Sequence, residues 1–172
     1  MAGVILNFNG KDNTVACLES IKKLEVRSEK LEVVVIDNGS EEKLEVRREK
    51  LEVIRNKENL GYAGGNNVGI RYAIEQGADY MLILNNDTLV YKKLVNELLH
   101  VAMSDSNIGI VAPKIYFAKG FEFHKDRYAK DELGRVIWYA GGIMDWSNIL
   151  GHHRGVDEVD HGQYGKIEET DF

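Results

Sequence analysis

The amino-acid sequence predicts an α/β fold built on a doubly wound, mostly parallel sheet. Short apolar segments alternate with segments of helical apolar spacing through residues 1–112, and this alternation is typical of parallel strands joined by helical crossovers. Residues 80–84 form an unbroken aromatic and aliphatic run, as expected for a strand that is buried on both faces. Polar residues follow the apolar segments, and right-handed crossovers place such strand ends along one edge of a sheet.

The elements of this part follow from apolar spacing and turn residues. Strands are expected at residues 4–7, 31–36, 51–54, 80–84 and 108–112. Helices are expected at residues 15–24, 64–75 and 94–103. Asp12 or Asn13 is expected to cap the first helix, and Gly77 is expected to end the second. A short charged helix is expected to begin at Ser40.

The pattern changes after Pro113. Residues 113–172 are rich in aromatic side chains, glycine and histidine, and they contain short alternating runs such as residues 135–139. Such a sequence favours irregular loops and antiparallel strands. Because no linker separates the two parts, we expect a single domain over residues 1–172. In it, residues 1–112 form the α/β part, and the remainder forms an irregular antiparallel part over one edge of the sheet.

Composition and charge exclude several classes of protein. The chain has 172 residues, of which 44% are hydrophobic and 29% charged, a balance typical of one globular domain. Its net charge of −6 argues against binding to nucleic acid or to an anionic membrane. No apolar run approaches about 18 residues, the length of a transmembrane helix. The single cysteine, Cys17, fits a reducing compartment, so we expect a cytoplasmic protein, with peripheral association at the inner face of the membrane as the alternative.

Four polar clusters follow the predicted strands, at residues 7–10, 37–40, 59–67 and 85–88. In open α/β sheets, ligands bind outside the carboxyl ends of the strands. One cluster alone is weak support, because strand ends are often polar, but four clusters at one edge indicate a ligand site. The alternative for the last cluster is a turn that only caps the next helix.

Individual residues in these clusters indicate how a nucleotide would bind. Asp37 follows an apolar strand, so its carboxylate is expected to be partly buried and to need a donor, such as an N–H or O–H group of a base or ribose. The alternative is an Asx-turn with Gly39. Glycines within residues 61–65 let the backbone approach a ligand, and the helix after them offers free N–H groups to phosphate. Asp87 offers one hard oxygen ligand, enough for Mg²⁺ or Mn²⁺ shared with a diphosphate.

At these clusters the sequence resembles family 2 of the glycosyltransferases, which has the GT-A fold. The matching segments, in order, are residues 4–10, 35–40, 59–67 and 84–88. Later segments are similar to the rhamnosyltransferase-like branch of that family: residues 138–142, 155–164 and 169–172. The resemblance implies an inverting transfer of a sugar, rhamnose in that branch, from a nucleoside diphosphate sugar. The acceptor it implies is a glycan or a lipid-linked molecule in the synthesis of a polysaccharide or cell-surface glycan.

The resemblance also implies a set of residues that bind the nucleotide sugar. They are Leu6, Asn7, Phe8, Asp37, Asn59, Gly64, Gly65, Asn66, Asn86 and Asp87. Residues 6–8 and Asp37 are expected to hold the base and ribose, and the loop around Asn59 is expected to line the nucleotide and diphosphate pocket. Asn86 and Asp87 take the place of the family's Asp-x-Asp element, with Asp87 on the metal.

One departure from the family concerns catalysis. Members of the family continue into an acceptor-binding segment that contains an acidic catalytic base, whereas this sequence ends at Phe172. We therefore expect a chain truncated before that segment, without the family's base. The remaining acids of the second part match no base motif, and they are Asp145, Asp157, Glu158, Asp160 and Asp171. Truncation also predicts exposed apolar surface and hence a homo-oligomer.

Three functions are compatible with these residues. The first is a nucleotide-sugar glycosyltransferase or its donor-binding part, and the second is a binding module that holds a nucleotide sugar without transferring it. The third is a nucleotidyltransferase on a similar sheet. That chemistry needs a Gly-rich, basic loop directly after the first strand, and residues 7–12 are a poor version of one.

Overall fold

The computed structural model describes residues 1–26, 31–46 and 50–172 of the chain. These residues form two compact units, Met1–His100 and Val101–Phe172, which we call the first and the second unit. The division lies twelve residues before the one expected from the sequence after residue 112. The expectation of a single domain over the whole chain stays a prediction.

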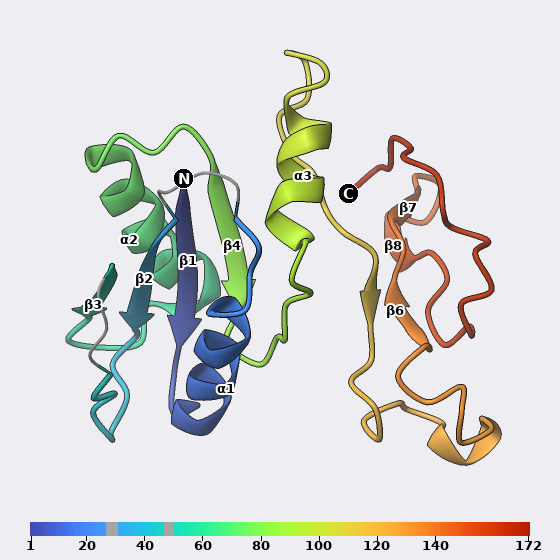
Figure 1. Cartoon of the computed structure of the whole chain (residues 1–172), viewed down its shortest axis with the longest axis horizontal. Helices are drawn as coiled ribbons and strands as arrows, with labels where there is room; N and C mark the ends of the chain where they lie inside the picture. Colours follow the sequence, from blue (N-terminus) through green and yellow to red (C-terminus); the bar gives the residue numbers. More distant parts are fainter. Residues whose placement is uncertain (27–30, 47–49) are drawn as a thin grey trace. The chain divides into compact units, whose positions relative to one another are not determined.

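A four-stranded parallel sheet forms the centre of the first unit. Its strands are β1 (Ala2–Asn7), β2 (Glu32–Asp37), β3 (Leu51–Arg55) and β4 (Met81–Asn85), in the order β3-β2-β1-β4. All neighbouring strands pair in parallel, and in Figure 1 the arrows of β1, β2 and β4 end at the same edge. The predicted α/β fold with a mostly parallel sheet is therefore confirmed.

Helices cover both faces of this sheet, as expected for parallel strands that are apolar on both sides. Ile5 lies in one core with side chains of α1 (Lys11–Ile21). Its neighbour Val4 faces the opposite side and lies in a second core with side chains of α2 (Gly61–Glu75). Gly69 allows α2 to approach β1 closely, because a Cβ atom there would lie 2.3 Å from Val4 Cγ1.

Two helix starts differ from the prediction. Gly10, rather than Asp12 or Asn13, precedes α1 as its cap residue, and it makes no side-chain capping bond. The chain turns directly from β1 into the helix because the side-chain oxygen of Asn7 accepts the N–H of Gly10 at 3.2 Å. The start of α2 lies three residues before the predicted Gly64.

The predicted end of α2 is confirmed. Gly77 has φ = 74°, a left-handed conformation that glycine adopts without strain. Its N–H donates to Ile74 O at 2.9 Å, and the next N–H, of Ala78, donates to Ala73 O at 3.0 Å. These bonds satisfy the last carbonyl groups of the helix, and β4 follows. The predicted helix at 94–103 is also present, as α3 (Leu94–Ala102).

Two predicted elements are absent from the part of the chain that the structure describes. Residues 108–112 form no strand, and Ile110 is almost fully exposed. An apolar run of this length does not distinguish a strand from an extended connection. No helix follows Ser40 within residues 40–46, because its hydroxyl instead accepts the N–H of Asn9 at 2.9 Å. The rest of that predicted helix, residues 47–49, lies outside the described residues.

The second unit contains short antiparallel strands and loops, as predicted. Its strands are β5 (Ile115–Tyr116), β6 (Ile137–Tyr139), β7 (Gly142–Asp145) and β8 (Leu150–His153), and its one-turn 3₁₀ helix η1 covers Lys125–Arg127. Strand β5 pairs with β6 and β7 pairs with β8. The expected position of this part over one edge of the parallel sheet stays a prediction.

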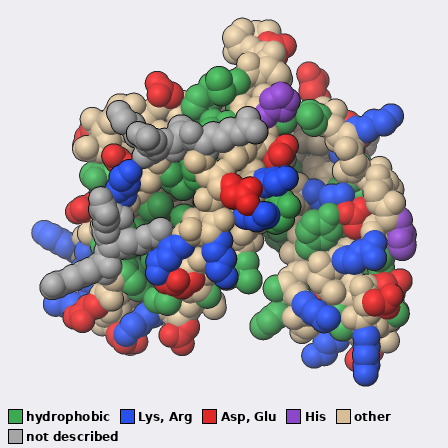
Figure 2. All heavy atoms as spheres, in the orientation of Figure 1, with side chains coloured by type: hydrophobic (Ala, Val, Ile, Leu, Met, Phe, Trp, Pro, Cys, Tyr) green, Lys and Arg blue, Asp and Glu red, His purple; other side chains and the backbone are tan. Residues whose placement is uncertain are grey.

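The surface carries charges of both signs. On the face shown in Figure 2, positive and negative side chains are interspersed, without a continuous area of one sign. This distribution agrees with the moderate net charge of −6 and offers no basic stripe of the kind that binds a nucleic-acid backbone. Across the described ranges, no helix combines the length and the apolar character needed to cross a bilayer.

Candidate nucleotide-sugar site

The polar residues predicted to form a ligand site lie at the carboxyl edge of the parallel sheet. Asn7 is the last residue of β1, Asp37 the last of β2, and residues 86–87 directly follow β4. The loop that contains Asn59 leads from β3 into α2, whose first two turns contain Gly64, Gly65 and Asn66. All ten predicted site residues therefore belong to the first unit and to one edge of its sheet.

The side chain of Asn7 is buried and joins three chain segments at this edge. Its oxygen accepts the Gly10 N–H at 3.2 Å and the Thr14 hydroxyl at 2.9 Å. Its nitrogen donates to Ser40 Oγ at 3.2 Å and approaches Asp37 Oδ1 at 3.4 Å. Asn7 thereby fixes the exits of β1 and β2 relative to each other.

Asn86 connects the exit of β4 to the same group. Its side-chain nitrogen lies 3.0 Å from Thr14 Oγ1, 3.1 Å from Gly10 O and 3.4 Å from Asn7 Oδ1. Gly10 makes room for it, since a Cβ atom at that position would lie 2.4 Å from the amide nitrogen. The nitrogen of Asn86 is therefore engaged with the protein, while the next residue, Asp87, is exposed.

Asn38 organises the loop between β3 and α2, a role that the sequence did not reveal. Its side chain is 1% exposed. Its nitrogen donates to Asn59 Oδ1 at 2.8 Å and to Gly61 O at 3.2 Å. Its oxygen accepts from Asn56 Nδ2 at 2.9 Å and from the Leu60 N–H at 3.1 Å. Because every partner lies 18 or more residues away, no local sequence pattern indicates these bonds.

The carboxylate of Asp37 is completely buried, more so than predicted. Its Oδ1 accepts the N–H of Ser40 at 3.3 Å, one residue beyond the Gly39 that the Asx-turn alternative named. Its Oδ2 lies 3.0 Å from Nη2 of Arg55, but the two groups are not aligned for a hydrogen bond. Arg55 was not recognised from the sequence, because only the pairing of β2 with β3 brings it opposite Asp37.

Gly64 and Gly65 of α2 allow close packing of the helix, in addition to any approach of a ligand. A Cβ atom on Gly65 would lie 2.4 Å from Leu6 Cδ1 and 3.0 Å from Asn38 Nδ2. One on Gly64 would lie 2.9 Å from Leu60 Cβ. These close contacts bring the first turns of α2 against the ends of β1 and β2.

The first turn of α2 leaves hydrogen-bonding groups open. Its cap residue, Leu60, makes no side-chain bond, and the turn holds no acidic residue. The Gly61 N–H donates to Asn59 Oδ1 at 2.8 Å, and the N–H groups after it suit an anion. Asn66 donates to Tyr62 O at 3.1 Å, but its own buried oxygen has no hydrogen-bond partner within the described ranges. A buried acceptor without a partner suits a ligand that brings a donor.

The surroundings of Asp87 suit a metal ion that is bound together with a diphosphate better than one held by protein side chains alone. Among the residues that the structure describes, no group of three or more His, Cys, Asp or Glu could hold a metal ion. One exposed carboxylate fits Mg²⁺ or Mn²⁺ whose other ligands are phosphate oxygens and water. Burial, and next the charge of Asp87, raise the pKa of the nearby Cys17 thiol to about 11. The thiol is buried, as is typical of a structural cysteine.

The acids of the second unit make hydrogen bonds within that unit. Asp157 lies 2.6 Å from Tyr128 Oη and 3.0 Å from Arg127 Nη1. Each of the five acids considered from the sequence accepts at least one such bond: Asp145, Asp157, Glu158, Asp160 and Asp171. These bonds explain the acids as loop-holding residues, and the catalytic base stays unassigned.

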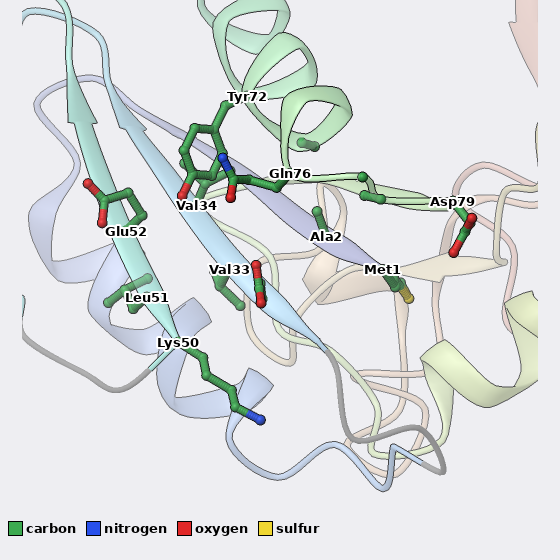
Figure 3. A pocket seen from close by; sticks show the side chains of 14 residues that line it. Met1, Ala2, Val33, Val34, Lys50, Leu51, Glu52, Tyr72, Gln76 and Asp79 are labelled. Carbon is green, nitrogen blue, oxygen red and sulfur yellow. The ribbon is translucent and has the colours of Figure 1, made fainter.

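A cavity of about 430 Å³ lies at the opposite, amino edge of the sheet. In Figure 3, Tyr72 and Gln76 extend from α2 near β2, and Glu52 lies on β3. Asp79, in the connection before β4, also lines the cavity. None of the ten predicted site residues contributes to it, so this cavity is separate from the candidate site.

Comparisons with known sequences relate the chain to glycosyltransferases. The family profile "Glycosyl transferase family 2" matches residues 4–158. The low-salt glycan biosynthesis hexosyltransferase Agl10 of Haloferax volcanii is 33% identical over 175 aligned positions, which cover 98% of this chain and 52% of that protein. The glycosyltransferase YfnE of Bacillus subtilis is 28% identical over 144 positions, covering 80% of this chain and 35% of that protein.

Solved structures show the same fold. The structure of S. aureus TarS 1-349 in complex with UDP-GlcNAc superposes with a TM-score of 0.53 at 20% identity, covering 65% of this chain and 36% of that one. The complex of the same protein with UDP gives a TM-score of 0.51. This chain spans about half of Agl10, about a third of YfnE and about a third of the TarS 1-349 chain. By the match over residues 4–158, it belongs to glycosyl transferase family 2.

Proposed function

We propose that the chain binds a nucleoside diphosphate sugar at the carboxyl edge of the first unit and is the donor-binding part of a glycosyltransferase. One observation carries this proposal. Four chain segments meet at that edge through buried and half-buried amide side chains, and they leave there the N-terminus of α2, whose cap residue makes no side-chain bond, and the exposed Asp87. Uncapped N–H groups and a carboxylate for a metal ion are the two features that a diphosphate requires.

The two ends of the ligand are proposed to bind different residues. Asp87, through Mg²⁺ or Mn²⁺, and the first turn of α2 hold the diphosphate. When bound there, the cation supplies compensation for the charge of the leaving diphosphate. Residues 6–8 line the base and ribose, where the exposed ring of Phe8 offers a stacking surface. The buried oxygen of Asn66 accepts a hydroxyl or N–H group of the ligand.

The reaction proposed is an inverting transfer of a hexose to a glycan or lipid-linked acceptor. The TarS structures contain UDP and UDP-GlcNAc, and Agl10 is described as a hexosyltransferase of glycan biosynthesis; both support a nucleotide-sugar donor. Rhamnose is the sugar that the resemblance of residues 138–142 favours. We also propose a cytoplasmic protein that works at the inner face of the membrane.

A second candidate function is a module that holds the donor without transferring the sugar. It is favoured by the hydrogen bonds that engage the acids of the second unit, such as those of Asp157. An inverting transfer needs a carboxylate in contact with the acceptor hydroxyl. A homo-oligomer, in which exposed apolar surface is buried, is proposed for either function.

Calorimetric titration of the full chain with UDP-, GDP- and dTDP-sugars, with and without Mn²⁺, tests the donor site. We expect one nucleotide to bind only with the metal and to lose at least about tenfold in affinity in Asp87→Ala, because Asp87 is the proposed carboxylate ligand of the shared cation. Asp79→Ala is the matched control, since Asp79 precedes the other end of β4. Equal affinities of the two variants, or no binding to the parent chain, would refute the proposal.

A further inference from the structure

We propose that the cavity at the amino edge of the parallel sheet binds a linear polyamine, a molecule whose ammonium groups are joined by short methylene chains. The cavity has a volume of about 430 Å³, which is within the range of small-molecule sites. It lies at the end of the strands opposite to the candidate nucleotide-sugar site, so this inference does not depend on the proposed function.

The floor of the cavity is apolar. Ala2, Val34 and Ala73 line it, and all three are buried. Tyr72 of α2 packs against the core that contains Val34, so the cavity lies on the face of the sheet that α2 covers. In Figure 3, the side chains of Tyr72 and Gln76 extend from the end of α2 near β2. Methylene groups of a ligand leave water when they lie on such a floor.

Three carboxylates line the cavity, and they come from different parts of the sheet edge. Glu52 belongs to β3, Glu32 begins β2, and Asp79 lies two residues before β4. The strand order is β3-β2-β1-β4, and neighbouring strands lie about 4.8 Å apart, so the carboxylates are spread across the edge. In the parts of the chain that the structure describes, none of these three side chains makes a hydrogen bond or an ion pair.

This spread of carboxylates favours an extended cation over a metal ion. Nowhere in the described ranges do three or more His, Cys, Asp or Glu residues come close enough together to hold a metal ion, and the carboxylates of the cavity are included in that statement. A linear polyamine carries its charges at separate points, and each ammonium group donates charge-assisted hydrogen bonds to a carboxylate. Its methylene chains then cover the apolar floor between these points.

The end of α2 adds to the negative potential at the cavity. The last turn of this helix contains no basic residue, although the C-terminus of a helix carries a partial negative charge that a cation stabilises. Its C-cap residue, Gln76, lines the cavity. Burial, and next the charges of Glu52 and Glu32, raise the pKa of Tyr72. Both carboxylates therefore act on the same phenol group, whose ring also offers a face to an ammonium group.

Two lining residues carry positive groups, Lys50 and Met1. Both take part in other interactions, and in Figure 3 the Lys50 side chain extends away from Tyr72 and Glu52. These groups oppose the entry of a single small cation. A molecule with several ammonium groups gains more, because it contacts more than one carboxylate at the same time.

Calorimetric titration of the full chain with spermidine in a low-salt buffer tests the site. We expect saturable binding, with amide chemical-shift changes at residues 72–79. Glu52→Gln should bind about threefold to fivefold more weakly, because one exposed charge pair contributes little, and the double variant Glu32→Gln/Glu52→Gln about tenfold more weakly. Glu58→Gln removes the same charge from an exposed position at the carboxyl edge and should bind like the parent chain.

The cobalt hexaammine cation separates a shaped site from a general attraction of cations to an acidic protein. It has the same formal charge as spermidine but is compact, so we expect the chain to bind spermidine more tightly. Equal affinity for the two cations would overturn the inference, and so would spermidine binding that is unchanged in the double variant or does not saturate. Thermal unfolding of each variant without ligand shows whether a loss of binding reflects a loss of fold.

Discussion

The two units of the molecule hold their loops together by different chemistry. At the carboxyl edge of the first unit, the neutral amides of Asn7, Asn38 and Asn86 join the strand exits, around the one buried carboxylate described there, that of Asp37. In the second unit, carboxylates occupy the corresponding positions, and Asp157 and Asp160 each bind a cationic side chain and a tyrosine hydroxyl. Amides do not titrate, whereas carboxylates do.

This difference bears on how a candidate site for an anion keeps its geometry when the pH changes. A network of amides keeps one geometry over a wide range of pH and adds no negative charge near a diphosphate. The carboxylate-based loops of the second unit depend on protonation state instead. Burial, and next the hydrogen bond to Asp157, raise the pKa of Tyr128 to about 12, so that tyrosine stays a donor throughout the neutral range. We therefore expect pH and charge to affect the second unit more than the first.

The largest expected loss of stability comes from placing a negative charge in the amide network of the first unit. Asn38→Asp keeps the shape of the side chain but removes the two hydrogen bonds that its nitrogen donates to Asn59 Oδ1 and Gly61 O. The new carboxylate then faces two acceptors, at a cost of about 3 kcal/mol at neutral pH. Because the protonated form is favoured there, its folded pKa lies above the unfolded value, and stability should increase as the pH falls.

Hydrogen exchange of peptides covering residues 31–66, measured at pH 5 and pH 8, is the suitable measurement for this variant. Asn67→Asp is the matched control, because Asn67 is exposed on α2 and a carboxylate there stays solvated. If Asn38→Asp exchanged like the control at both pH values, the network would not hold this loop.

The comparison also shows what the sequence can and cannot reveal. The strands, and the edge at which their polar ends meet, follow from local patterns: an apolar run that stops at polar residues, as residues 80–84 do before Asn85. The partners of Asn38, and Arg55 as the partner of Asp37, do not, because strand pairing and loop packing bring them from 18 or more residues away. Local patterns therefore indicated the edge at which the candidate site lies, but they did not distinguish the residues that make hydrogen bonds within the protein from those left open to a ligand.

Some local patterns also misled. Residues 108–112 resemble a strand, but pairing, which no local pattern encodes, decides whether an apolar run becomes one. Ser40 resembles a helix cap, but its hydroxyl accepts from Asn9 and Asn7 instead. Both errors arise where a tertiary contact, or its absence, outweighs local preference.

An intermediate loss of stability is expected when the charge of Asp160 in the second unit is removed. Burial raises its pKa, but hydrogen bonds from Lys114 and Tyr116 outweigh burial and lower it to about 2. Because the folded pKa lies below the unfolded value of about 3.9, the stabilisation is complete above about pH 4 and is lost as the pH falls to 2. Asp160→Asn should therefore destabilise the second unit by about 1–2 kcal/mol at neutral pH.

The pH profile provides the check on Asp160. Exchange of peptides covering residues 135–160 should accelerate between pH 4 and pH 2 in the parent chain, and this acceleration should be reduced in Asp160→Asn. Peptides from residues 1–21 of the first unit serve as the internal reference in the same samples. An unchanged profile in the variant would show that another group causes the acid sensitivity.

The smallest effect on stability is expected from removing an exposed charge of the first unit, that of Lys11. Lys11 pairs with Glu42, and Lys114 pairs with Asp160 at 2.6 Å. The Lys11 side chain is 43% exposed, that of Lys114 only 22%. An exposed pair is screened by water and salt, and Lys11 begins α1, where a positive charge opposes the helix dipole.

Lys11→Gln should therefore leave the exchange of the first unit unchanged, whereas Lys114→Gln should accelerate exchange in the second. The two substitutions remove the same group from the same kind of pair, so the contrast isolates burial as the cause. Repeating both measurements in about 1 M salt tests this contrast further. At a Debye length of about 3 Å, salt screens the exposed pair far more than the half-buried one. Equal effects at both lysines would mean that the first unit depends on surface charge as much as the second does, and the contrast between amide and carboxylate networks would then not hold.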